Sequence, residues 1–110
     1  MEFRKGILFV RLKGHLTKDT VSHLQEEVTD RIQKNGIRNV VFNIEKLKEI
    51  DLKGVHALFY NYEICHKQKG QILLCGLKDN LVSKKIRNSR LLGYMTPLEN
   101  ELGAFHLIQI

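Results

Sequence analysis

The sequence predicts one α/β domain, built on a mixed sheet of roughly four to five strands and covered by about four helices. Short apolar runs typical of buried strands alternate along the chain with segments in which apolar residues recur at helical spacing. A length of 110 residues is enough for one hydrophobic core, and 43% hydrophobic residues with a single proline argue against disorder. We therefore expect a single domain over residues 1–110.

The first predicted element is a strand near the N-terminus. Residues 7–12 (ILFVRL) are apolar apart from one arginine, and Lys13-Gly14 is expected to end the strand. Phe3–Lys5 is expected to form a short partner strand that turns at Gly6, because glycine is favoured in tight hairpin turns.

A helix is predicted over residues 20–34. Its apolar residues fall on one face, and Asn35-Gly36 supplies residues that commonly end a helix. Thr17 or Asp19 is expected to cap the N-terminus, because a side-chain oxygen there can accept the free N–H groups of the first turn. The apolar positions are Val21, Leu24, Val28 and Ile32.

The central stretch of the chain is expected to hold the best-buried strand of the sheet. Val40–Ile44 is apolar at all but one position, which suits a strand buried on both faces, and Glu45–Glu49 is expected to be a charged connector. A helix is predicted over 52–69, with Asp51 as its N-cap. Residues 51–54 therefore fall beside the end of a strand, where α/β domains commonly place functional residues.

The C-terminal half is predicted to begin with a buried strand over Gln71–Cys75. A shorter basic helix over 79–88 should follow, opened by Asp79 or Asn80 as the N-cap. A brief last strand is expected at Tyr94-Met95.

The final predicted element is a helix over 97–107. In Thr96–Glu99 (TPLE), threonine stands at the N-cap, proline at the first helical position and glutamate at the third. This arrangement is a capping box, because the threonine and glutamate side chains can satisfy backbone N–H groups at the start of a helix.

The predicted core combines the apolar faces of these elements. Cys65 and Cys75 fall in a predicted helix and a predicted strand without C-x-x-C spacing, so we expect buried free thiols. The five histidines show no metal-ligand pairing and no nucleophile–base arrangement is visible, so neither a metal centre nor an enzyme is expected. The residues expected to be buried are Val10, Leu12, Val21, Leu24, Val28, Val41, Phe42, Ile44, Val55, Leu58, Leu73 and Phe105.

The formal net charge is +6, and its densest part is Lys78–Arg90, where five basic residues accompany one aspartate. This segment has no aromatic residue, and the chain shows no helix-turn-helix, zinc or RNA-recognition signature, so a solvated basic helix face is favoured over a nucleic-acid site. No apolar run reaches the roughly 20 residues that span a membrane, and no secretory signal is visible. We expect a cytoplasmic protein.

Five stretches together resemble the STAS domain of bacterial anti-sigma factor antagonists. They are RLKGHLT (Arg11–Thr17), IRNVVFNIEKLKEID (Ile37–Asp51), LKG (Leu52–Gly54), KGQILLCGL (Lys69–Leu77) and SRLLGYM (Ser89–Met95). They follow the family's order and cover essentially the whole chain. The resemblance implies the STAS fold and binding to an anti-sigma factor, which is typically a serine kinase. In the family, this binding causes the anti-sigma factor to release the sigma factor.

In that family, the kinase phosphorylates the first serine after the aspartate at the start of the second helix. The phosphate adds about two negative charges there and can repel the partner. The matching residue here is Leu52, followed by Lys53, and no serine or threonine occurs between Thr29 and Ser83. The resemblance therefore implies binding that is not switched by phosphorylation at the usual site, and whether Ser83 or Ser89 is phosphorylated instead stays open.

The candidate binding residues lie in two loops and on one helix. Leu52 is either an apolar contact on an exposed loop or a residue folded onto the sheet, and Lys53 either indicates an acidic partner or is merely tolerated. Asp51 is favoured as a helix cap over a catalytic acid. The residues expected to contact a partner are Thr17, Asp51, Leu52, Lys53, Gly54, His56 and Tyr60.

The sequence thus favours a protein-interaction module that resembles an anti-sigma factor antagonist and binds an anti-sigma factor or a related regulator. The alternative is a STAS-type sensor that holds a nucleotide or lipid between helices and sheet. No cofactor is expected, and a homodimer stays open.

Overall fold

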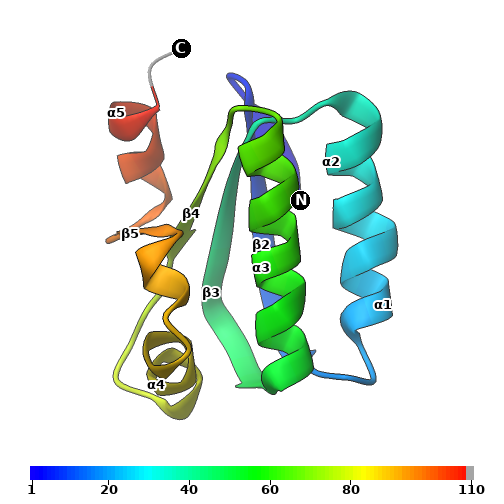
Figure 1. Ribbon diagram of the computed structural model, residues 1–110. Helices are drawn as coiled ribbons and strands as arrows, with labels where there is room; N and C mark the ends of the chain where they lie inside the picture. The colour runs from blue at the N-terminus through cyan, green and yellow to red at the C-terminus, as the bar shows by residue number, and fades with distance from the viewer. Residues whose placement is uncertain (109–110) are drawn as a thin grey trace.

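A five-stranded sheet in the order β1-β2-β3-β4-β5 forms the centre of the molecule (Figure 1). The structure is a computed structural model that describes residues 1–108, so the last two residues of the predicted 1–110 domain lie outside it. Strand β1 is antiparallel to β2, and the other neighbours are parallel, which confirms the predicted mixed sheet. The strands are β1 (Glu2–Arg4), β2 (Ile7–Leu16), β3 (Asn39–Ile50), β4 (Gln71–Cys75) and β5 (Thr96–Leu98).

Helices cover both faces of this sheet. In Figure 1, α3 stands in front of the sheet between the α1–α2 helix and α4, while α5 lies beside β5. The larger apolar cluster packs beneath the α1–α4 side, and a smaller one joins the other face to α5. The helical segments are α1 (Val21–Leu24), η1 (Gln25–Thr29), α2 (Asp30–Asn35), α3 (Leu52–Lys67), α4 (Leu81–Asn88), η2 (Leu91–Gly93), η3 (Glu101–Gly103) and α5 (Ala104–Leu107).

The predicted N-terminal hairpin is confirmed. Lys5 and Gly6 form its turn, with φ values of 51° and 81°. Positive φ at both central residues is what a tight hairpin turn between twisted strands requires. β1 therefore folds back onto the first residues of β2.

Strands β2 and β3 are longer than predicted. The expected strand end at Lys13-Gly14 and the expected connector over Glu45–Glu49 are both wrong, because the two strands stay paired as far as Leu16 and Ile50. The register shifts between Arg11 and Lys13 and between Gly14 and His15. Such bulges break the two-residue alternation by which a half-buried strand is recognised.

The predicted first helix is continuous from Val21 to Asn35, with a π-helical middle. Its end is confirmed, since Gly36 adopts the left-handed conformation with φ of 60°. Its start differs from the prediction, because neither Thr17 nor Asp19 caps it with a side chain. Thr20 is the N-cap, and the carbonyl of Thr17 accepts the backbone N–H groups of Thr20 and Val21 at 2.9 Å.

The predictions for α3, β4 and α4 are confirmed within a few residues, with Asn80 as the cap of α4. The predicted strand at Tyr94-Met95 and the helix start at Pro97 are wrong. Residues Thr96–Leu98 instead form β5, and a 3-10 turn capped by Asn100 precedes α5. Proline is tolerated in β5 because this strand lies at the edge of the sheet.

The core agrees with most of the predicted buried set. Cys65 and Cys75 are free and buried, as expected. Four residues of the set, Leu12, Val21, Val55 and Phe105, are only half-buried. The eight that are buried are Val10, Leu24, Val28, Val41, Phe42, Ile44, Leu58 and Leu73.

Candidate protein-docking surface

Asp51 joins the start of α3 to the loop that follows β2. Its Oδ1 accepts the backbone N–H of Gly54 at 2.9 Å, which makes it the N-cap that the sequence predicts. Its Oδ2 accepts the backbone N–H of Lys18, also at 2.9 Å. These bonds, chiefly that from Lys18, lower the pKa of Asp51 below its usual value of 3.8. The carboxylate is thus engaged in holding two loops together.

Gly54 lets α3 begin close to the end of β2. A Cβ atom at this position would lie 2.1 Å from the carbonyl oxygen of Leu16 and 2.8 Å from the side chain of Ile50. The backbone N–H of Asp51 reaches the same carbonyl of Leu16 at 3.3 Å. Gly54 is itself buried, so it affects the surface only by setting how closely α3 approaches the end of β2.

Four of the predicted contact residues form an exposed stripe on α3. Leu52, His56 and Tyr60 are spaced four residues apart, so their side chains follow one face of the helix, with Lys53 beside them. Leu52 is 67% exposed and Tyr60 is 49% exposed. Leu52 therefore projects from the first turn of α3, away from the sheet.

Thr17 lies next to this stripe in the chain segment that the Lys18–Asp51 bond holds. It is half-buried, and its backbone N–H donates to Thr20 Oγ1 at 2.8 Å. The loop is therefore ordered by its own hydrogen bonds as well as by Asp51. We call the set Thr17, Asp51, Leu52, Lys53, His56 and Tyr60, with Gly54 beneath it, the α3 surface.

Two neighbouring polar contacts were missed by the sequence analysis. His15 Nδ1 and Glu49 Oε1 lie 2.9 Å apart on the paired ends of β2 and β3. The Lys18 contact with Asp51 uses a backbone N–H, so no side chain in the sequence could signal it. The His15–Glu49 pair was hidden because Glu49 was assigned to a connector.

A further polar cluster lies on the opposite face of the sheet. Arg11 donates from Nε and Nη2 to the two carboxylate oxygens of Glu101, at 2.9 and 2.7 Å, and Asn43 donates to the same carboxylate at 2.9 Å. The Arg11 bonds lower the pKa of Glu101 below its usual value of 4.5. This cluster fastens the segment before α5 to β2 and β3.

Both cysteines lie in the interior of the protein. Burial raises the pKa of Cys65 to about 12 and that of Cys75 to about 11, so both thiols stay protonated at neutral pH. The described residues hold no cluster of three or more His, Cys, Asp or Glu suited to a metal ion. In the same part of the chain, every helix falls short of the length and apolar character that a membrane crossing requires.

Comparisons with known proteins agree with this fold. The STAS domain model matches residues 1–104. The anti-sigma F factor antagonist of Paenibacillus polymyxa is 24% identical over 110 residues, which span 100% of this chain and 93% of that protein. The anti-sigma factor antagonist SpoIIAA in its unphosphorylated form superposes with a TM-score of 0.79 at 16% identity, covering 100% of this chain and 96% of that one. Its phosphorylated form, from Bacillus, gives 0.75 at 18% identity, covering 98% and 96%. The chain belongs to the STAS domain family.

Proposed function

We propose that this protein is an anti-sigma factor antagonist-like interaction module whose α3 surface binds an anti-sigma factor of the serine kinase type, or a related regulator. The similarity to the Paenibacillus antagonist supports this class of partner. The observation that carries the proposal is the double hydrogen bond of Asp51, which holds the Lys18 loop and the exposed Leu52 in one surface. Such a module acts where sigma factors act, in the bacterial cytoplasm.

The proposal includes binding that is not switched by phosphorylation at the usual site. Leu52, the first residue after Asp51, has no hydroxyl group to accept a phosphate. Ser83 is buried and its Oγ accepts the backbone N–H of Lys78 at 2.8 Å. Ser89 donates its hydroxyl to the carbonyl of Ile86 at 2.6 Å. Neither serine is presented on the α3 surface, so we expect the binding-competent form to be permanent.

Leu52 and Lys53 would make this contact different from one centred on a serine. Burying a leucine side chain in a well-fitting interface contributes roughly 1.5–3 kcal/mol. A lysine at the rim of the interface mainly affects the association rate and the salt dependence, through an acidic patch on the partner. Control of the complex would then rest with protein abundance or with another component.

The test is a binding titration against the anti-sigma kinases of the source organism, with ATP and with ADP. The complex is expected to form equally well under both conditions, and the intact mass of the chain should not increase by a phosphate. Phosphate recovered on Ser83 or Ser89 together with loss of binding would contradict the proposal. Native mass spectrometry of the purified chain distinguishes this function from that of a ligand sensor, because a sensor is expected to carry a co-purifying nucleotide or lipid.

A further inference from the structure

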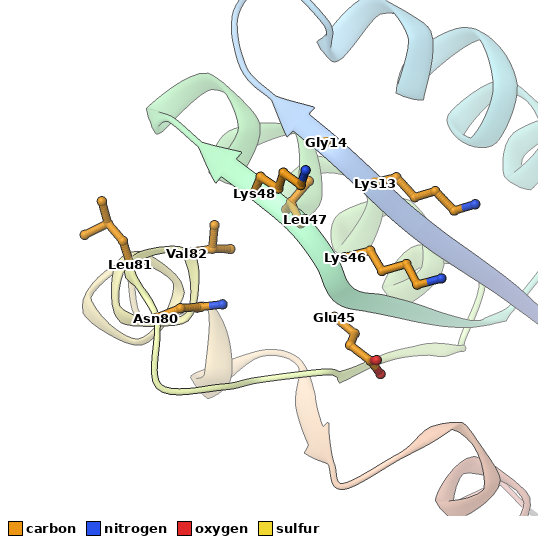
Figure 2. A pocket seen from close by; sticks show the side chains of 9 residues that line it. All are labelled: Lys13, Gly14, Glu45, Lys46, Leu47, Lys48, Asn80, Leu81 and Val82. Carbon is orange, nitrogen blue, oxygen red and sulfur yellow. The ribbon is translucent and has the colours of Figure 1, made fainter.

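Strands β2 and β3 continue beyond the rest of the sheet. The pairing of β3 with β4 ends at Asn43, whereas its pairing with β2 continues to Ile50. Beside this two-stranded extension, a groove of about 590 Å³ separates β3 from the start of α4. Figure 2 shows the side chains that line it. We call it the lysine groove.

Three lysines give the groove its charge. Lys13 and Lys46 are direct partners on neighbouring strands and extend in the same direction, while Lys48 follows two residues further along β3 (Figure 2). Within residues 1–108, none of the three forms an ion pair. Like charges placed opposite each other on paired strands are destabilising, so an anion bound here would relieve a repulsion already present.

The groove also has an apolar side. Leu81, at the first turn of α4, is 65% exposed, and Leu47 and Val82 contribute buried side chains to the lining. Glu45 is the one carboxylate that lines the groove among the described residues, and it pairs with no cation there. An occupant that matches this lining carries carboxylates close to an aliphatic side chain.

We propose that the lysine groove binds an extended acidic segment of a partner protein, with carboxylates on the lysines and an intervening leucine-type side chain against Leu81. A single-stranded nucleic acid is a poorer match, because the groove lining includes no aromatic ring or guanidinium on which a base could stack. None of the groove residues belongs to the α3 surface. The inference therefore does not rest on the function proposed above.

A labelled synthetic peptide, Glu-Asp-Leu-Glu-Asp-Leu-Glu-Asp, serves as the probe in fluorescence anisotropy at low salt. The double variant Lys13→Ala/Lys46→Ala is expected to weaken binding about five-fold or more, since each charge contact contributes only modestly. The control Lys34→Ala/Lys67→Ala removes the same charge from exposed positions on α2 and α3. It should change the affinity for the peptide less than about two-fold. Leu81→Ser should weaken binding without any change in charge.

Thermal unfolding checks that the groove variants fold, and removing the Lys13–Lys46 repulsion should leave the melting temperature equal or slightly higher. The proposal is overturned if the unaltered protein does not bind the peptide, or if the control loses as much affinity as the groove variant. It is also overturned if a single-stranded oligonucleotide binds more tightly than the peptide and loses affinity with the same two lysines. A peptide affinity that depends on both the lysines and Leu81 is the supporting result.

Discussion

The backbone N–H of Lys18 lies 2.9 Å from Asp51 Oδ2, which joins two residues 33 positions apart in the chain. Because the other carboxylate oxygen caps α3, one side chain fixes both the loop after β2 and the first turn of the helix. The α3 surface therefore depends on Asp51 for its shape, and Leu52 owes its position to the residue before it.

Replacing Asp51 with asparagine is expected to free the Lys18 loop. Asparagine caps helices well, but it has a single acceptor oxygen, so its NH₂ group would face the N–H of Lys18. The amide of Lys18 should exchange hydrogen faster in the variant, while the amides of β3 should be unchanged. Asp19→Asn is the control, because the Asp19 carboxylate makes no hydrogen bond among the described residues. Equal exchange at Lys18 in both variants would contradict the account.

The stability of the protein is expected to fall in acid. Folding lowers the pKa of Asp51 through the Lys18 and Gly54 amides, and that of Glu101 through Arg11. A carboxyl group of this kind stabilises the fold above its usual pKa, 3.8 for Asp51 and 4.5 for Glu101. Its contribution is lost as the pH falls through the lower value of the folded state.

Thermal unfolding between about pH 5 and pH 2 measures this loss. Glu101→Gln removes one of the two carboxyl groups whose pKa is lowered by folding. The melting temperature of this variant should therefore be lower at neutral pH and should fall less steeply in acid. If the melting temperature of Glu101→Gln follows the same pH profile as that of the unaltered protein, the Arg11–Glu101 contact does not contribute to the pH dependence of stability.

Gly54→Ala is expected to destabilise the protein although alanine is the better helix former. The gain in helix propensity is about 1 kcal/mol. The new Cβ would lie 2.1 Å from the carbonyl oxygen of Leu16, and overpacking against a backbone commonly costs about 1–3 kcal/mol or more. Gly93→Ala is the control, because no atom beyond its own neighbours in the chain lies within 4 Å of its Cβ position. A Gly54→Ala variant as stable as Gly93→Ala would refute the close approach.

The buried hydrogen bond between Thr29 and Asn61 should behave as a coupled pair. Thr29 Oγ1 donates to Asn61 Oδ1 at 2.8 Å, linking the π-helical segment to α3. Thr29→Val leaves the buried oxygen without its donor and should cost about 1–3 kcal/mol. Asn61→Leu also removes the acceptor that Thr29→Val leaves without a donor. The double variant should therefore lose less free energy of unfolding than the two single variants lose together. Additive free energies of unfolding would show that the pair is not coupled.

The features that the sequence predicted well are local. Asp51 and Asn80 cap helices through bonds to residues three positions ahead, and Gly36 ends a helix by its own backbone conformation. Such signals lie within a few residues of one another. The order of strands and helices could be predicted for the same reason, since each apolar run shows its own period.

The failures arose where distant residues decide local structure. Lys46, Leu47 and Glu49 belong to a strand because β2 pairs with them, and the extra residues that the two register shifts place in β3 obscure the alternation. The TPLE pattern at Thr96 is a good local capping signal, yet its first three residues pair with β4 instead. The link between Lys18 and Asp51 was unpredictable because it uses a backbone group that every residue other than proline possesses.

The α3 surface is proposed to bind its partner through Leu52, and the most direct test is a titration of Leu52→Asp against an anti-sigma factor that binds the unaltered protein. Aspartate cannot be desolvated as leucine can, so binding should weaken several-fold or more, while its charge at a helix N-terminus should preserve the fold. Leu102→Asp is the matched control, because Leu102 is also 67% exposed but lies in η3, outside the α3 surface. The account predicts a loss of affinity for Leu52→Asp alone. Unchanged affinity in Leu52→Asp would contradict it and place the interface elsewhere on the molecule.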